Sequence, residues 1–165
     1  MRAFTAAALA LALCGCLNAV DLPDHSATPV LDPIQFFEGE TSGRGTLSVI
    51  TGERRDIAVS STGTVLEDGS IRLVQRIDDG DGSPATRVVT MRALGDGRYE
   101  GTVTDAVEPL TAQVEGNRMT LRYRTPDERV RQILVLEDDR TLRNRLDAYR
   151  WGLNVARLDE TIVKD

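Results

Sequence analysis

The sequence predicts an all-β domain that folds as an antiparallel, up-and-down β-barrel. From about residue 41 onward, short runs alternate apolar and polar side chains, which is typical of strands with one buried face. Turn sequences such as EDGS at 67–70 separate these runs, and no stretch between them is long enough for a crossover helix. Sequential hairpins close most simply as a barrel, because a barrel leaves no strand edge exposed. A two-sheet β-sandwich is the alternative.

The first predicted strands lie near residues 46–49, 54–66 and 71–77. In the third strand, Leu73 and Gln75 belong to one face, and arginines at 72 and 76 belong to the other. The acidic loop DDGDGSP follows at 78–84. It fails the pattern of an EF-hand calcium loop, because Pro84 stands where that loop needs glycine. We therefore expect a solvated turn there and no metal site.

The clearest strand signal is RMTLRYR at 118–124, with apolar side chains on one face and arginines on the other. The segment 130–137 is apolar on both faces near its middle, which predicts a central or covered strand. In 141–149, Leu142, Leu146 and Tyr149 are spaced four and three apart, which favours a short helix or an irregular turn. The last run, 151–163, changes its alternation near Arg157, as a β-bulge would make it do.

The N-terminal residues have the pattern of a bacterial lipoprotein leader. Arg2 precedes an apolar run over residues 3–13, which is too short to span a bilayer. The sequence LCGC at 13–16 has an aliphatic residue three positions before Cys16 and small residues at the next two. Cleavage before Cys16 would expose a thiol for lipid attachment, and two or three acyl chains hold a protein stably on a membrane.

We therefore divide the chain into a lipoprotein signal peptide (1–15), a lipidated cysteine with a proline-containing tether (16–34) and a single barrel domain (35–165). Leu17 is not the aspartate that retains lipoproteins at the inner membrane, so we expect an anchor in the outer membrane, facing the periplasm. The sequence has 2 cysteines, Cys14 and Cys16, and both lie in this N-terminal region, so no disulfide or cysteine metal site is expected in the domain.

Composition and motifs argue against nucleic-acid binding and catalysis. The net charge of −6 repels phosphate, and 4% aromatic residues offer little stacking surface. The single histidine, His25, lies in the tether, and no GxSxG, P-loop or HExxH motif occurs. Acidic pairs fall at predicted turns, where carboxylates are solvated. We expect no enzyme activity and no cofactor.

Apolar and aromatic side chains on the inward faces of the predicted strands are candidates for the lining of a ligand cavity. A barrel of this kind holds either a packed interior or one small ligand, and because small barrels can fill themselves, such residues more often form an ordinary core. The candidate lining residues are Tyr99, Met119, Leu121, Tyr123 and Trp151.

Several short motifs, by their order and spacing, resemble a family of Gram-negative lipoproteins known only as a domain of unknown function. The resemblance covers roughly residues 35–164 and implies a lipocalin-like barrel in a lipoprotein that faces the periplasm. It implies no catalytic residues. The motifs are FFEG at 36–39, GRG at 43–45, DGRYEGT at 96–102 with Asp105, GN at 116–117 before Tyr123, NR at 144–145, WGL at 151–153 and Lys164.

Together these observations predict a membrane-anchored envelope lipoprotein that binds or carries a lipid or other apolar small molecule. The alternative is a structural or interaction lipoprotein with a filled barrel, which docks an envelope protein through Arg122, Arg124 and Arg131. A cavity on the order of a few hundred Å³ would favour the first hypothesis, and a solid interior would favour the second.

Overall fold

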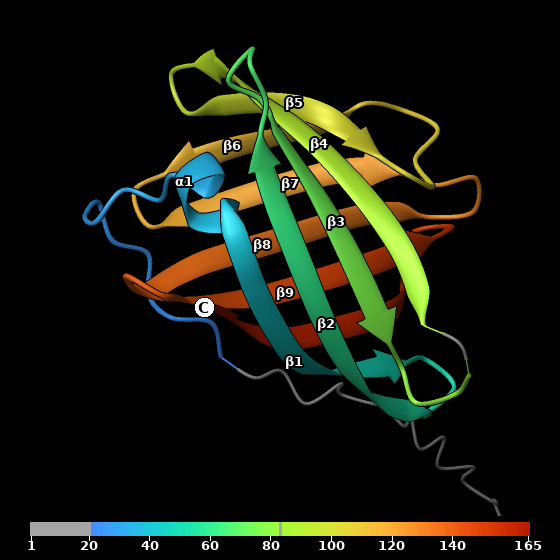
Figure 1. Cartoon of the computed structure of the whole chain (residues 1–165). Helices are drawn as coiled ribbons and strands as arrows, with labels where there is room; N and C mark the ends of the chain where they lie inside the picture. Colours follow the sequence, from blue (N-terminus) through green and yellow to red (C-terminus); the bar gives the residue numbers. More distant parts are fainter. Residues whose placement is uncertain (1–20, 83) are drawn as a thin grey trace, which may run out of the picture.

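In the computed structural model, which describes residues 21–82 and 84–165, the chain forms one closed barrel of ten antiparallel strands (Figure 1). Each strand pairs with the next along the chain, and β1 closes the barrel by pairing with β10. This confirms the predicted up-and-down barrel over the sandwich. The elements are α1 (Pro33–Phe37), β1 (Gly39–Val49), β2 (Arg54–Val65), β3 (Ile71–Asp78), β4 (Ala85–Gly95), β5 (Arg98–Val103), β6 (Leu110–Glu115), β7 (Arg118–Arg124), β8 (Arg129–Asp138), β9 (Thr141–Arg150) and β10 (Leu153–Lys164).

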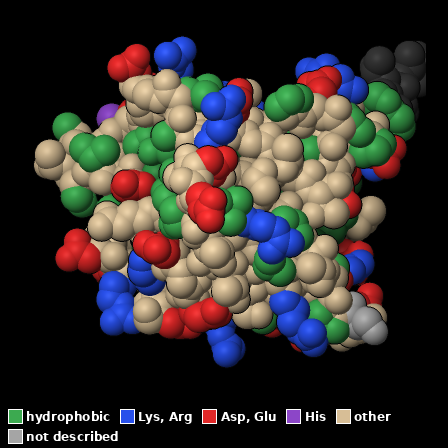
Figure 2. All heavy atoms as spheres, turned by 45° about the horizontal axis from the view of Figure 1, so that its top comes forward, with side chains coloured by type: hydrophobic (Ala, Val, Ile, Leu, Met, Phe, Trp, Pro, Cys, Tyr) green, Lys and Arg blue, Asp and Glu red, His purple; other side chains and the backbone are tan. Residues whose placement is uncertain are grey.

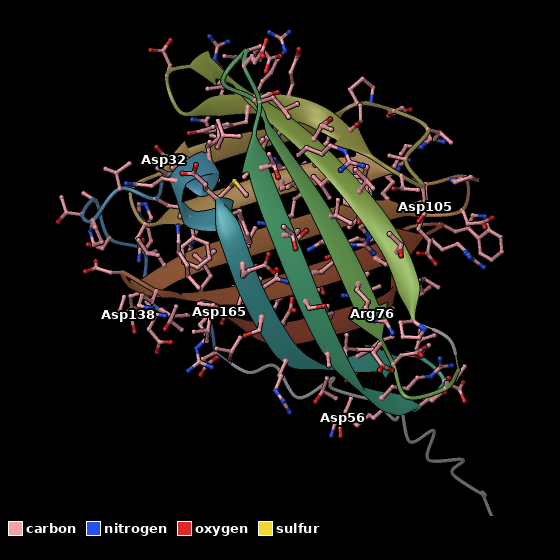
Figure 3. All side chains as sticks on the ribbon, viewed as in Figure 1. Asp32, Asp56, Arg76, Asp105, Asp138 and Asp165 are labelled. Atoms are coloured by element: carbon pink, nitrogen blue, oxygen red, sulfur yellow. The ribbon has the colours of Figure 1, made fainter. Side chains whose placement is uncertain are left out.

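The short helix α1 closes one end of the barrel. Asp32 caps the helix, because its side chain accepts hydrogen bonds from the backbone N–H groups of Ile34 (3.0 Å) and Gln35 (3.1 Å). Phe36 and Phe37 are buried and contact each other edge to face, with ring centroids 5.1 Å apart. Figure 3 shows Asp32 beside α1, and Asp105 at the other end of the barrel.

The segment that precedes α1 packs on the same end of the barrel. Leu31 is 2% exposed and belongs to the hydrophobic core, and its N–H donates to the carbonyl of Gly116 at 2.8 Å. The buried side chain of Asn117 accepts from the N–H of Ser26 at 2.8 Å. The structure therefore seats this part of the predicted tether on the turn between β6 and β7, and no spacer separates it from the domain.

The segment 141–149 is strand β9, so the predicted helix or irregular turn is wrong. Its even-numbered positions point inward, as the burial of Leu142, Asn144 and Ala148 shows. The buried Asn144 interrupts the apolar alternation, and the remaining spacing of Leu142, Leu146 and Tyr149 then imitates a helix. The structure also places the irregularity of β10 between Asn154 and Ala156, slightly before the predicted position.

Strand β8 is buried on both faces, as its apolar sequence predicted. Leu134 points into the barrel and is 2% exposed, and Val135 on the opposite face is 0% exposed. At the end of the barrel away from α1, the carboxylates of Asp79 and Asp81 lie 3.1 and 3.7 Å from Arg55. The acidic loop is thus partly neutralised by the protein itself. Among the described residues, no helix is long and apolar enough to cross a membrane.

Candidate ligand-binding cavity

The barrel encloses a cavity with a volume of about 230 Å³. Its wall is mostly aliphatic. All ten strands contribute to it: β1, β5 and β6 with one residue each, and the other seven with two or more. The lining residues are Phe37, Leu47, Ile57, Val59, Ile71, Leu73, Gln75, Ile77, Arg87, Val89, Met91, Val103, Leu110, Met119, Leu121, Tyr123, Gln132, Leu134, Asn144, Leu146, Leu158, Glu160 and Ile162.

The cavity is sealed at the α1 end and reaches solvent at the other end. Lining residues near α1, such as Ile71 and Met119, are each 2% exposed. Lining residues toward the opposite loops, such as Leu47, Ile77 and Leu158, are only half-buried. We call this second end the mouth, and it is bordered by the described residues of the loops at 50–53, 79–82, 104–109, 125–128 and 151–152.

Three of the five residues predicted to line a cavity do so. Met119, Leu121 and Tyr123 alternate along β7 and point into the barrel, where each is buried. Tyr99 is half-buried and packs against the hydrophobic core, but it does not reach the cavity wall. Burial raises the pKa of Tyr123 above the ordinary value, because the phenolate would lose its water.

The prediction that Trp151 lines the cavity is wrong. Its side chain is 93% exposed at the turn between β9 and β10. The residue has a φ of 51°, and with the following Gly152 it makes the tight hairpin connection. The apolar alternation from 151 to 155 imitates a strand, but its first two residues form the turn, so the indole lies outside the barrel.

A hydrogen-bonded polar cluster, formed by Gln132, Asn144 and Glu160, lies in the cavity wall. The Nε2 of Gln132 donates to the Oδ1 of Asn144 at 2.9 Å, and the Nδ2 of Asn144 donates to the Oε2 of Glu160 at 2.7 Å. The three residues come from the neighbouring strands β8, β9 and β10. Because buried polar groups need partners, this chain of hydrogen bonds explains how an amide and a carboxyl group are tolerated inside.

Two glycines of β1 make room for Glu160. A Cβ added to Gly43 would lie 2.0 Å from the Oε1 of Glu160, and one added to Gly45 would lie 2.3 Å from the backbone carbonyl of Asp159. The GRG motif at 43–45 is therefore a steric requirement of the seam between β1 and β10. Sequence reasoning missed Glu160, although its place between Leu158 and Ile162 puts a carboxyl group in an otherwise apolar inward row.

Among the described residues, Arg87 is the one basic side chain on the cavity wall. It lies on β4 directly opposite Gln75 of β3, and both side chains face inward. Its positive charge acts on Tyr123 and Glu160 and lowers the pKa of each, although burial outweighs this effect in both. The cavity thus has an apolar wall, one cation and one carboxyl group.

Several charges on the outer surface form ion pairs. Arg145, next to Asn144 in sequence, points outward and its Nε lies 2.8 Å from Asp159, and Arg157 lies 2.7 Å from Asp147. Figure 2 shows acidic and basic side chains interspersed over one face of the molecule. Arg122, Arg124 and Arg131, the predicted docking residues, are exposed on β7 and β8. Within the described chain, no cluster of His, Cys, Asp and Glu could hold a metal ion.

Glu160 predicts a specific pH dependence of stability. Burial raises the pKa of its carboxyl group, and the Asn144 hydrogen bond and the Arg87 charge only partly oppose this. The folded state therefore binds the proton more tightly than the unfolded state. The contribution of this group to the free energy of unfolding is fully present below the pKa of glutamate in the unfolded chain, which is about 4.3. It is lost as the pH rises through the raised pKa of the folded state.

The variant Glu160→Gln cannot ionise and should lose this dependence. We expect it to be about as stable as the wild type at pH 4 and more stable at pH 8, by about 1 kcal/mol. This is the lower end of the desolvation penalty for a buried polar group whose hydrogen bonds are incomplete. Urea unfolding at both pH values measures the difference. Glu67→Gln, at an exposed position without a partner among the described residues, is the control and should show no such change. Equal effects of the two variants would contradict the assignment.

The ten-stranded closed barrel with its central cavity places the protein in the class of lipocalin-like β-barrels. More particularly, the chain belongs to the family described as "Protein of unknown function (DUF3833)", whose model matches residues 10–164. The predicted membership of a barrel family of unknown function is thereby confirmed. No curated protein sequence matches the chain.

Three solved structures are similar in fold. The S-type phycobiliprotein lyase CPES from Guillardia theta has a TM-score of 0.65 at 8% identity, covering 80% of this chain and 90% of that one. A DUF3598-family protein of unknown function from Nostoc punctiforme has a TM-score of 0.65 at 14% identity, covering 83% and 50%. Rv2717c from M. tuberculosis has a TM-score of 0.63 at 15% identity, covering 82% and 99%. At these identities the likeness shows the fold alone.

Proposed function

We propose that the protein binds a small apolar molecule, such as a single-chain lipid, inside its barrel. The observation that carries the proposal is the cavity of about 230 Å³ with its mostly aliphatic wall and its mouth at one end. A solid interior would have favoured a purely structural barrel. The lipocalin-like fold supports the proposal, because a barrel of this size can hold one small ligand. The proposal assigns no reaction to the barrel.

The size of the cavity limits the ligand. An engineered cavity of about 150 Å³ is enough for benzene, and pockets for drug-sized ligands take about 300–1,000 Å³. One water molecule occupies about 30 Å³ in the liquid. If a methylene group takes a similar volume, a cavity of about 230 Å³ has room for about eight of them. We therefore propose a ligand with one short or medium acyl chain, or the end of a longer chain whose remainder passes through the mouth.

Native mass spectrometry of the full chain, purified from its own host, tests the proposal. We expect a fraction of the protein to carry a co-purifying molecule that leaves on mild activation. Protein that is free of any such molecule in repeated preparations, and that binds no added 1-octanol, would contradict the proposal.

We further propose that acylated Cys16 anchors the barrel to the membrane, and that the anchor lies in the outer membrane with the barrel in the periplasm. Cys16 lies outside the described residues, so this proposal is supported by the sequence of the leader. The carbonyl of Asp24 accepts a hydrogen bond from the Nδ2 of Asn117 at 3.2 Å, and the N–H of Ser26 binds the same side chain. About seven residues, 17–23, therefore join the proposed anchor to this contact, which would hold the barrel near the membrane surface.

The variant Cys16→Ser should lose the thiol to which the lipid is attached. We expect the variant protein to move from the membrane fraction to the soluble periplasmic fraction, because the remaining chain has no acyl group to hold it. Fractionation and immunoblotting measure the change, with Cys14→Ser as the matched control that should stay in the membrane. Retention of Cys16→Ser in the membrane fraction would disprove the anchor.

A further inference from the structure

The cavity contains a cation whose hydrogen-bonding groups are unused. Arg87 is half-buried on the cavity wall, and its guanidinium group has five N–H donors and no acceptor of its own. Across residues 21–82 and 84–165, it makes no hydrogen bond and no carboxylate oxygen lies within 4.0 Å of it. Other arginines near the mouth, such as Arg55 and Arg150, have acidic partners.

The carboxyl group in the same cavity does not neutralise Arg87. Glu160 is held on the seam between β1 and β10, where Asn144 donates to its Oε2. Arg87 acts on it only through space, and burial still raises the pKa of the Glu160 carboxyl group. The two charged groups are therefore separate features of one cavity, and Arg87 remains available to a molecule that enters it.

The groups around Arg87 add further polar contacts at the same level of the barrel. Gln75 is its cross-strand partner. The amide Nε2 of Gln75 donates to the Oγ of Ser61 at 3.4 Å, which is long and therefore weak for a hydrogen bond. Tyr123 also lines the cavity, and its hydroxyl group has no hydrogen-bond partner within the described chain. Both side chains could donate to an acceptor that Arg87 binds.

These polar groups lie toward the mouth, and the apolar wall continues from them to α1. The β3–β4 pair ends at the mouth with Ile77 opposite Ala85, and Gln75 opposite Arg87 is the next inward-facing pair. At the sealed end of the same two strands, Ile71 lies opposite Met91. A molecule with a polar head and an apolar tail therefore fits in one direction. Its head meets Arg87, and its tail lies among residues near α1.

We propose that Arg87, with Gln75 and Tyr123, binds the anionic head group of an amphiphilic ligand, most simply the carboxylate of a short- or medium-chain fatty acid. An arginine forms two parallel hydrogen bonds to a carboxylate, and bonds to charged groups are stronger than neutral ones. The inference rests on the proposed binding function and specifies the ligand class for the same cavity. It excludes a neutral lipid as the preferred ligand.

Calorimetric titration of the full chain at pH 7.5 with octanoate, 1-octanol, octylamine and octyl phosphate tests the assignment. The four probes share one tail length and differ in the head group. We expect octanoate to bind about tenfold more tightly than 1-octanol, which corresponds to one charge-assisted hydrogen bond. Octyl phosphate distinguishes two kinds of anion site. At a general anion site its affinity equals or exceeds that of octanoate, and at a site shaped for a carboxylate its affinity is lower.

Variants locate the effect. Arg87→Met should remove the preference for octanoate and leave the affinity for 1-octanol unchanged, which also shows that the variant is folded. Arg76→Met is the matched control, because Arg76 lies on the outer face of β3 and is exposed (Figure 3). It should keep the full preference. If Arg87→Met does not fold, Arg87→Gln serves in its place. The order of the four probe affinities on the wild type tests the preference for an anionic head group without any variant.

The outcomes separate the two proposals. Equal binding of octanoate and 1-octanol, a preference for octylamine, or a preference that survives removal of Arg87 would overturn the anion site and leave an apolar binding cavity. If none of the four probes binds, the proposed binding function fails, and the anion site fails with it.

Discussion

Val89→Trp is expected to abolish binding of small apolar molecules while the barrel stays folded. Val89 is half-buried on β4, lines the cavity and packs against the hydrophobic core. An indole at this position would occupy space that the ligand needs. Because the added atoms enter an existing cavity, the free energy of unfolding should fall by less than about 3 kcal/mol, the upper end of the usual cost of overpacking. We expect the affinity for 1-octanol, measured by calorimetric titration, to fall at least about tenfold.

Val88→Trp is the matched control for this variant. Val88 is the preceding residue of the same strand, and it faces outward because neighbouring residues of a strand point to opposite sides. Its contacts to Thr104 are made by its backbone N–H and carbonyl groups, which the substitution keeps. This control should bind 1-octanol like the wild type. If both variants bind equally well, the ligand does not occupy the barrel.

Gly63→Ala is expected to cause the largest loss of stability. A Cβ at Gly63 would lie 1.7 Å from the carbonyl oxygen of Phe37 and 3.2 Å from the Cδ1 of Ile71. The first neighbour is backbone, so either β2 or the helix α1 must move. Overpacking of this kind costs about 1–3 kcal/mol and occasionally more, and we expect about 3 kcal/mol at this position. Urea unfolding measures the change.

Ala58→Val is the control for Gly63→Ala, because it adds atoms to the same strand at an exposed position. It should alter the free energy of unfolding by no more than about 0.5 kcal/mol. A Gly63→Ala variant as stable as this control would show that α1 does not close the barrel in the way described.

The fold was largely predictable because strands with one buried face alternate strictly. RMTLRYR at 118–124 predicted both β7 and the inward direction of Met119, Leu121 and Tyr123. Turn sequences such as EDGS at 67–70 marked the hairpins, here with Gly69 at a φ of 78°. Closure of the sheet followed from the sequential order of the hairpins, since no other pairing covers both edges as simply.

The prediction failed where a polar residue belongs to the interior or an apolar one belongs to a turn. Asn144 breaks the inward row of β9, and its burial depends on Glu160, which is 16 residues away in sequence. Trp151 continues the apolar alternation but has the backbone of a hairpin turn. Such cases depend on contacts between distant strands, and the local pattern cannot show them.

The polar groups of the cavity left a weaker signal that sequence reasoning could have used. The inward row of β4 runs backward from Met91 and Val89 to Arg87, and an arginine in an inward row is a functional candidate. Gln75, Gln132 and Glu160 stand in similar rows on β3, β8 and β10. Each residue alone is equally compatible with a frayed strand end, so only the closed barrel shows that they share one cavity.

The central claim is that an apolar molecule binds inside the barrel, and methyl NMR of the isotope-labelled full chain tests it most directly. On titration with 1-octanol, we expect shifts at the methyl groups of Leu73, Met119, Leu121 and Leu134, which line the cavity. The methyl groups of Val65, Val107 and Val163, which are 38%, 56% and 38% exposed, should stay unchanged. Shifts confined to these exposed groups, or no shifts at saturating 1-octanol, would contradict the claim.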